Sequence, residues 1–268
     1  MRTPCISIIT PCYQAGDKLL ETIQSVLDQT FEDYEIIVKD AGSDDGSIGH
    51  LPADPRIRLI RTGDDGIYDG MNQAIAAAVG EYLYFLNCGD RLHDRYVLQR
   101  IGEAIEARES ADPCIYYGDV MELQTGQRVN AKPQMTHFAM YRNLPCHQAC
   151  IYSRDLFHDR QFDTGYRVRA DYEHFLWSVM QRGAEAIAMD LVIADYEGGG
   201  FSETAENRKR SAKEHQEITE RYFTKSELLR FRLAMLLSLQ PLRARLASSK
   251  RTAALYDGIK NAVYRKKT

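Results

Sequence analysis

The chain has 268 residues, of which 44% are hydrophobic and 27% are charged, and its formal net charge is −4. This composition excludes a largely disordered chain, and the slight negative charge excludes a nucleic-acid binder that relies on bulk positive charge. No stretch approaches the roughly 18 uncharged apolar residues of a transmembrane helix, and the first residues lack the pattern of a signal peptide. We therefore expect a cytoplasmic protein with one α/β domain and an appendage.

The first half of the chain alternates short apolar runs with segments of helical periodicity. Strands are expected at residues 6–9, 34–39, 56–60 and 82–86, and helices at 19–27, 71–79 and 97–107. This alternation predicts a single Rossmann-like, mostly parallel sheet flanked by helices. Ligands of such sheets bind beyond the carboxyl ends of the strands, so the residues that follow each strand are the candidates for a site.

The residues after the predicted strands lack the common phosphate-binding motifs. The segment TPCYQ (10–14) contains neither GxGxxG nor GxxxxGK[ST], which argues against hydride transfer and NTP hydrolysis. It also lacks the Gly-rich loop of a sugar nucleotidyltransferase, so nucleotidyl transfer is only a weak alternative function for this chain. Acidic residues follow instead, in KDAGSDDGS (39–47) and NCGD (87–90). A carboxylate repels an anionic ligand unless a divalent cation lies between them, but it can accept hydrogen bonds from the N–H groups of a base and from ribose hydroxyls. This pattern therefore indicates a nucleotide diphosphate held through a metal.

Several segments, in the same order, resemble family 2 glycosyltransferases, which have the GT-A fold. They are SIITPCYQAGDKLLETIQSVLDQTFEDYEIIVKDAGSDDGS, DDGIYDGMNQAIAAAVGEYLYFLNCGD, CHQACIYSRDLF, FDTGYRVRADYEHFL and ADYEGGGFS. The resemblance covers about residues 5–222, and GIYDGMN and HQA are similar to elements of bacterial capsule and exopolysaccharide transferases of the colanic acid type. It implies inverting transfer of a sugar from a UDP- or GDP-linked donor to a saccharide acceptor, expected to be lipid-linked, in bacterial surface polysaccharide biosynthesis.

The resemblance also implies a set of donor-binding positions. These are Thr10, Pro11, Tyr13, Asp40, Ser43, Asp45, Asp69, Asn72, Asn87, His147 and Gln148. Asp40 is expected to accept a hydrogen bond from the nucleotide base, although the local residues are equally typical of an Asx turn. Asp69 is also interpretable as a helix N-cap, and His147 as a structural histidine. Residues 196–202, with three glycines, resemble the segment that closes over the donor.

Two acidic residues are the candidates for the chemistry. NCGD stands where most relatives have Asp-x-Asp followed by Asp, so Asp90 is the carboxylate left to hold Mg²⁺ or Mn²⁺ on the diphosphate. Asp171 matches the family's catalytic base, which takes the proton of the acceptor hydroxyl, with Ala170 in place of the usual preceding acid. Without the resemblance, Asp171 would be interpreted as the N-cap of a helix over 172–181. These departures motivate the other alternative function, a non-catalytic nucleotide-sugar-binding or scaffold subunit of a polysaccharide assembly.

The last part of the chain differs in charge from the rest. Residues 224–268 carry eleven Lys and Arg against two acidic residues, a net charge of +9, whereas the first 223 residues carry −13. Residues 204–222 predict a charged helix, followed by a leucine-rich run with basic residues. We expect a transferase domain over 1–222 and a basic amphipathic helical tail over 223–268, which holds the protein on the inner face of the cytoplasmic membrane. The alternative is a helix that packs on the body or in a dimer interface.

Overall fold

The computed structural model describes residues 5–198 and 204–237. The chain divides into two compact units, Met1–Ile218 and Thr219–Thr268, which are treated separately below. The glycines at 199 and 200 of the predicted closing segment, and the tail beyond residue 237, lie outside the described residues. Among the helices that are described, none is long and apolar enough to cross a membrane.

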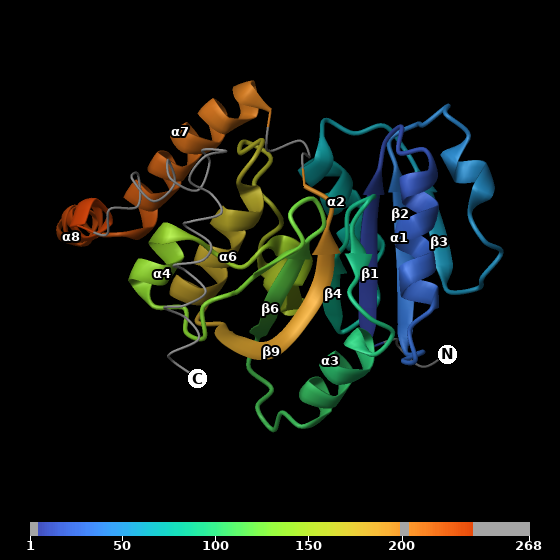
Figure 1. Cartoon of the computed structure of the whole chain (residues 1–268), viewed down its shortest axis with the longest axis horizontal. Helices are drawn as coiled ribbons and strands as arrows, with labels where there is room; N and C mark the ends of the chain where they lie inside the picture. Colours follow the sequence, from blue (N-terminus) through green and yellow to red (C-terminus); the bar gives the residue numbers. More distant parts are fainter. Residues whose placement is uncertain (1–4, 199–203, 238–268) are drawn as a thin grey trace. The chain divides into compact units, whose positions relative to one another are not determined.

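Nine strands within the described part of the first unit form one sheet, in the order β3-β2-β1-β4-β8-β6-β9-β5, with β7 beside β6 (Figure 1). The strands are β1 (Ile6–Cys12), β2 (Tyr34–Asp40), β3 (Ile57–Arg61), β4 (Tyr82–Phe85), β5 (Arg91–Leu92), β6 (Cys114–Glu122), β7 (Gln127–Val129), β8 (Cys150–Ser153) and β9 (Glu185–Tyr196). β3, β2, β1 and β4 are parallel, as are β6 and β9, whereas β8 runs antiparallel between β4 and β6. Most paired residues are parallel, which confirms the predicted α/β class.

Helices cover both faces of this sheet, because successive side chains of a strand point to opposite sides. The helices are α1 (Asp17–Leu27), α2 (Ile67–Ala77), α3 (Val97–Glu106), α4 (His137–Arg142), α5 (Asp155–Asp159) and α6 (Ala170–Met180), with short 3-10 turns η1 (Ser47–His50) and η2 (His147–Ala149). On one face, Ile8 belongs to a buried cluster with Ile23 of α1 and Ile101 of α3. On the other face, the ring of Phe85 lies 5.4 Å from that of Phe157 in α5.

The helix α2 begins four residues earlier than the sequence pattern predicts. Its N-cap is Gly66, whose φ of 123° is a conformation that glycine adopts without strain. The apolar spacing is visible only from Met71 onward, because Asp69 and Gly70 interrupt it. The earlier start places Tyr68 and Asp69 in the first turn of the helix, close to the edge of the sheet where β1, β2 and β4 end.

Two helices follow the sheet in sequence. α7 (Ala205–Tyr222) runs across the division between the two units, and α8 (Lys225–Leu237) belongs to the second. Within the second unit, the rings of Phe223 and Phe231 lie 5.7 Å apart. The predicted boundary after residue 222 stays a prediction.

Candidate active site

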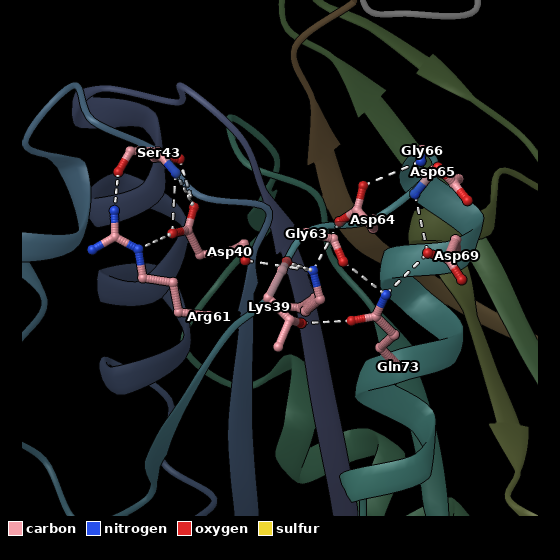
Figure 2. A network of polar contacts seen from close by, with 11 residues as sticks. Lys39, Asp40, Ser43, Arg61, Gly63, Asp64, Asp65, Gly66, Asp69 and Gln73 are labelled. Carbon is pink, nitrogen blue, oxygen red and sulfur yellow. Dashed lines mark hydrogen bonds and ion pairs between the residues drawn. The ribbon is translucent and has the colours of Figure 1, made fainter.

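The loop that follows β2 is built around the carboxylate of Asp40. Its Oδ1 accepts hydrogen bonds from the backbone N–H and the hydroxyl of Ser43, at 3.0 and 2.6 Å, and its Oδ2 is 3.1 Å from the Arg61 guanidinium (Figure 2). The Ser43 N–H also lies 3.1 Å from Oδ2. Three donors thus hold the carboxylate, and the Ser43 N–H is shared between its two oxygens, so a base N–H would compete with donors that are already in place. Arg61, whose side chain is 54% exposed, is the partner easiest to displace.

The ends of β1 and β2 are joined through the same loop. Cys12 and Asp40 are register partners, and the N–H of Gln14 donates to the Ser43 hydroxyl at 2.9 Å. Asp45 accepts the N–H of Gly16 at 2.7 Å and the Ser47 hydroxyl at 2.6 Å. Bonds from Ser47 and Gly16 lower the pKa of Asp45, so its carboxylate stays ionised near neutral pH.

The predicted donor residues of β1 differ in exposure. Thr10 is fully buried, and its hydroxyl oxygen has no hydrogen-bond partner among the described residues. The carbonyl of Pro11 accepts the Cys88 thiol at 3.3 Å, and Tyr13 is 66% exposed. The donor roles of these three residues and of Asp40, Ser43 and Asp45 stay predictions.

A second network pins the loop between β3 and α2. Lys39 is fully buried, and its Nζ donates to the carbonyl of Thr62 at 2.7 Å and to Asp64 at 2.8 Å (Figure 2). Asp69 accepts the backbone N–H of Asp65 at 3.1 Å and the Gln73 amide at 3.0 Å. The N-cap of α2 is Gly66, so the alternative interpretation of Asp69 as the N-cap is wrong. Asp69 nevertheless accepts a backbone N–H just ahead of the helix.

Asn72 holds the segment that precedes α6. Its amide nitrogen donates to the carbonyl of Phe162 at 2.9 Å, and its amide oxygen accepts the Phe162 N–H at 3.0 Å. Both amide atoms are thus occupied within the protein. The role of Asn72 in donor binding stays a prediction, and the observed contact is structural.

The loop NCGD after β4 meets the HQ element at the start of η2 through two pairs. The amide nitrogen of Asn87 lies 2.8 Å from Nε2 of His147, and the amide of Gln148 donates to Oδ2 of Asp90 at 2.8 Å. The other oxygen of Asp90 accepts the N–H of Glu197 at 3.1 Å. Four of the predicted site residues, far apart in sequence, therefore lie in one cluster.

Asp90 is the candidate metal ligand. It is 4% exposed, and burial raises its pKa above the usual range. None of the ion pairs found in the described part of the chain involves Asp90, and no group of three His, Cys, Asp or Glu there could hold a metal. A buried carboxylate without a basic partner fits a divalent cation that takes its remaining ligands from a diphosphate and water.

Asp171 lies in the first turn of α6 with a partner on each carboxylate oxygen. The Tyr68 hydroxyl is 2.8 Å from Oδ1, and Nδ1 of His147 is 3.4 Å from Oδ2. Burial alone would raise the pKa of Asp171, but the bonds from His147 and Tyr68 outweigh it and lower the pKa below its usual value. The helix N-cap is Arg169, and no side chain caps it, so the interpretation of Asp171 as the N-cap is wrong.

The segment before α6 is held by a residue that sequence reasoning missed. Glu214 of α7 is 5% exposed, and its carboxylate accepts the backbone N–H groups of Arg167, Val168 and Arg169 at 2.9 to 3.0 Å. These N–H groups lie at the start of α6, where a helix leaves its donors without intrahelical partners. Glu214 thereby fixes the turn of α6 that carries Asp171.

A pocket of about 300 Å³ opens beside Asp171. Of the predicted site residues, His147, Gln148 and Asp171 line it, whereas the predicted donor residues of β1 and β2 do not. Its wall includes the aromatic residues Tyr172 and Phe175 of α6, and Arg169 adds a positive charge. A pocket of this size beside an ionised carboxylate can bring a hydroxyl of a bound molecule to a general base.

Comparisons with known proteins agree on the family and the fold. The family described as Glycosyl transferase family 2 matches residues 7–166. A PGL/p-HBAD biosynthesis glycosyltransferase of Mycobacterium bovis is 32% identical over 211 residues, which cover 76% of this chain and 81% of that protein.

Two solved structures share the fold. S. aureus TarS, residues 1–349, matches with a TM-score of 0.60 at 18% identity over 72% of this chain, and this chain spans only 60% of that one. The mannosyltransferase PcManGT of Pyrobaculum calidifontis, in complex with GDP-Man and Mn²⁺, matches with a TM-score of 0.59 at 16% identity, covering 99% of this chain and 82% of that one. The chain therefore belongs to glycosyl transferase family 2 and is a glycosyltransferase with the GT-A fold.

Proposed function

We propose that this glycosyltransferase moves a sugar from a UDP- or GDP-linked donor to a lipid-linked saccharide in the assembly of a bacterial surface polysaccharide, a capsule or exopolysaccharide. The observation that carries the proposal is the carboxylate of Asp171, ionised and held by two partners at the wall of a pocket. The similar TarS was solved with UDP and with UDP-GlcNAc, and PcManGT with GDP-Man. The similar M. bovis protein is named for PGL/p-HBAD biosynthesis.

In the proposed reaction, Asp171 is the general base. As the acceptor hydroxyl attacks the anomeric carbon, its O–H bond breaks and the proton passes to the Asp171 carboxylate. The new bond from the acceptor oxygen forms on the face opposite the leaving group, and the bond from the anomeric carbon to the diphosphate breaks with its electron pair on the diphosphate. The configuration at the anomeric carbon is therefore inverted.

Asp90 is the residue proposed to hold Mg²⁺ or Mn²⁺. Its buried, unpaired carboxylate supports this role, as does the Mn²⁺ in the PcManGT complex. A bound cation would neutralise the charge that develops on the leaving diphosphate. Gln148 orients the carboxylate through Oδ2, and the backbone of Glu197 does so through Oδ1.

The pocket beside Asp171 is proposed to receive the acceptor. Aromatic walls from Tyr172 and Phe175 suit the apolar faces of sugar rings or an apolar aglycone, and Arg169 suits a phosphate or a hydroxyl. The donor is assigned to the ends of β1 and β2, around Asp40. In this arrangement, the cluster of Asn87, His147 and Asp171 stands between donor and acceptor.

The tail is proposed to hold the enzyme on the inner face of the cytoplasmic membrane, where a lipid-linked acceptor is presented. In α8, Leu229, Leu233, Leu236 and Leu237 are 50 to 82% exposed, on a helical face that also carries Lys225 and Arg232. Basic residues accompany them at Lys225, Arg230 and Arg232, which anionic lipids attract. Flotation with vesicles of anionic lipid tests this: Leu233→Glu in the full chain should reduce binding, and Leu123→Glu, at an exposed loop leucine, should not. Equal binding of both variants and the wild type would contradict it.

The function itself is tested by supplying UDP-, GDP-, dTDP- and CMP-sugars with Mn²⁺ and with EDTA. Release of nucleotide diphosphate and binding of each donor are measured separately. We expect one UDP- or GDP-sugar to stand out and to require the metal. A donor that binds but never turns over, with any acceptor offered, would favour the non-catalytic subunit instead.

A further inference from the structure

The hydroxyl of Tyr68 connects the motif GIYDGMN to the proposed base. Tyr68 lies on α2, 103 residues before Asp171, and its oxygen is 2.8 Å from Oδ1 of Asp171 and 2.9 Å from the carbonyl oxygen of Val168. Its ring packs against that of Phe162, with centroids 5.4 Å apart. The family resemblance assigns roles to Asp69 and Asn72 of this motif but none to Tyr68.

The two oxygens around Tyr68 compete for a single proton. A phenol has one O–H to donate and lone pairs with which to accept, whereas the Val168 carbonyl only accepts. Burial and the charge of Asp171 raise the pKa of Tyr68 well above its usual value, so the hydroxyl keeps its proton. When Asp171 is ionised, Tyr68 donates to Oδ1, the stronger acceptor. A proton taken from the acceptor enters a lone pair that faces the acceptor, so Tyr68 continues to donate to Oδ1 and the Val168 carbonyl remains its second acceptor.

The other side of the carboxylate is held by an independent chain. Asn87 donates its amide hydrogen to Nε2 of His147, which leaves the ring proton on Nδ1, 3.4 Å from Oδ2 of Asp171. With Tyr68 on Oδ1 and His147 on Oδ2, the plane of the carboxylate is fixed from α2 and from η2. The lone pairs not used by these two bonds are left for the acceptor hydroxyl.

We propose that Tyr68 is the positioning residue of the catalytic base, which holds Asp171 before and after proton transfer by donating its hydroxyl to Oδ1. This inference rests on the proposed role of Asp171. In the transfer step, the proton lost by the acceptor oxygen ends on a lone pair of Asp171 that faces the acceptor, and Tyr68 keeps its hydrogen bond to Oδ1. The base is thus aligned throughout proton transfer, the step whose rate depends on its orientation.

Other titratable groups surround Asp171 and have to stay constant in a test. They are the imidazole of His147 from η2, the thiols of Cys146 and Cys150, the hydroxyl of Tyr152 from β8, and Glu214 of α7, which holds the backbone ahead of α6. Tyr68→Phe leaves all of these in place. It also keeps the ring that packs on Phe162, so the fold should tolerate the change.

The experiment measures nucleotide-diphosphate release by the full chain, with the best donor of the panel, over an acid-to-neutral pH series. Tyr68→Phe should lower kcat about tenfold, the effect of one hydrogen bond to a charged group, with the KM for the donor unchanged. The acid limb of the pH profile should move to higher pH, because a bond that lowers the pKa of Asp171 is gone. The control Tyr96→Phe, at a tyrosine that is 46% exposed, should change neither.

A double variant separates this inference from the proposed function. Because Tyr68 acts through Asp171, Tyr68→Phe should cause no further loss in a chain that already carries Asp171→Asn. A tenfold loss in both backgrounds would overturn the positioning role and leave the base assignment intact. Full activity of Asp171→Asn alone would instead overturn the base assignment.

A measurement without substrate completes the test. The ¹³C carboxyl signal of Asp171, assigned by its loss in Asp171→Asn, is titrated in the wild type, in Tyr68→Phe and in a chain with 3-fluorotyrosine at position 68. The pKa of Asp171 should rise in Tyr68→Phe and fall with the more acidic fluorotyrosine. Identical titrations in the three proteins would overturn the proposal whatever the turnover.

Discussion

Two polar clusters at the edge of the sheet are assembled in different ways. Around Asp40, every partner of the carboxylate comes from the same loop or the neighbouring strand, namely Ser43 and Arg61. Around Asp171, the partners come from α2 and η2, while α7 holds the backbone ahead of the helix. The first cluster is a local turn, and the second exists only once distant segments have packed together.

This difference has a consequence for how each cluster responds to substitution. A local turn retains its remaining bonds when one partner is removed, because the neighbouring residues in sequence still hold the chain. A cluster drawn from separate segments loses its geometry when one segment is released. We therefore expect the proposed base to be the part of the site most sensitive to changes made at a distance.

The largest effect on stability is expected from Glu214→Ala. The substitution leaves three backbone N–H groups at the start of α6 without an acceptor, all in partly or fully buried positions. We expect the free energy of unfolding to fall by about 4 kcal/mol, from the lost cap and the unsatisfied donors. Urea unfolding measures this loss, and kcat of the folded fraction should fall with it.

Glu217→Ala is the matched control for that prediction, because Glu217 lies about one turn further along α7 and pairs with Lys213 at the surface. Its effect should be within about 0.5 kcal/mol. If the two variants unfolded alike, α7 would not support the α6 segment in the way described.

A somewhat smaller effect is expected from pH, through His174 of the helix that carries Asp171. Burial lowers the pKa of His174 to about 4, and its ring stacks on Phe157 at 4.0 Å. The unfolded chain protonates this histidine as the pH falls through about 6.5, whereas the folded chain resists until about 4. Stability is therefore complete above 6.5 and is lost between 6.5 and 4, by up to about 3 kcal/mol.

Unfolding free energies across this pH range check the prediction. His174→Gln should flatten the dependence between pH 6.5 and 4, while His158→Gln, at an exposed histidine of α5, should leave it unchanged. A slope that is the same in the wild type and in His174→Gln would contradict the assignment.

The smallest effect is expected at the local cluster, from Arg61→Ala. Arg61 is half exposed, and Asp40 retains the N–H and hydroxyl of Ser43. We expect a loss of about 1.5 kcal/mol in the free energy of unfolding, because the fully buried Asp40 loses one charged donor but keeps its bonds to Ser43. A loss as large as that of Glu214→Ala would remove the contrast between the two clusters.

Much of the fold could be predicted from the sequence, because periodicity reports burial directly. The apolar runs at β1, β2 and β4 are buried, and the apolar stripe of α1 packs on them as its spacing predicts. The strands β5, β7 and β9 were not predicted. β5 has two residues, β7 is exposed throughout, and β9 mixes buried and exposed residues without strict alternation. None of these carries the period that a sequence pattern can detect.

The family motifs named some residues that the fold brings together, but they did not name the residues that support them through packing. Asn87, His147 and Asp171, which the resemblance named, lie next to one another, and their roles stay predictions. Tyr68 and Glu214 could not be found in this way, because their partners lie far along the chain. Glu214 is buried in a helix whose other residues are mostly polar or charged, and no apolar stripe marks the face that it occupies.

The central claim is that Asp171 is the base of a glycosyl transfer, and Asp171→Asn tests it most directly. The amide retains the size of the side chain but cannot take the acceptor proton. We predict that kcat for release of nucleotide diphosphate falls by about 10²- to 10⁴-fold, while the donor binds as tightly as to the wild type. An Asp171→Asn enzyme that turns over at the wild-type rate would contradict the account.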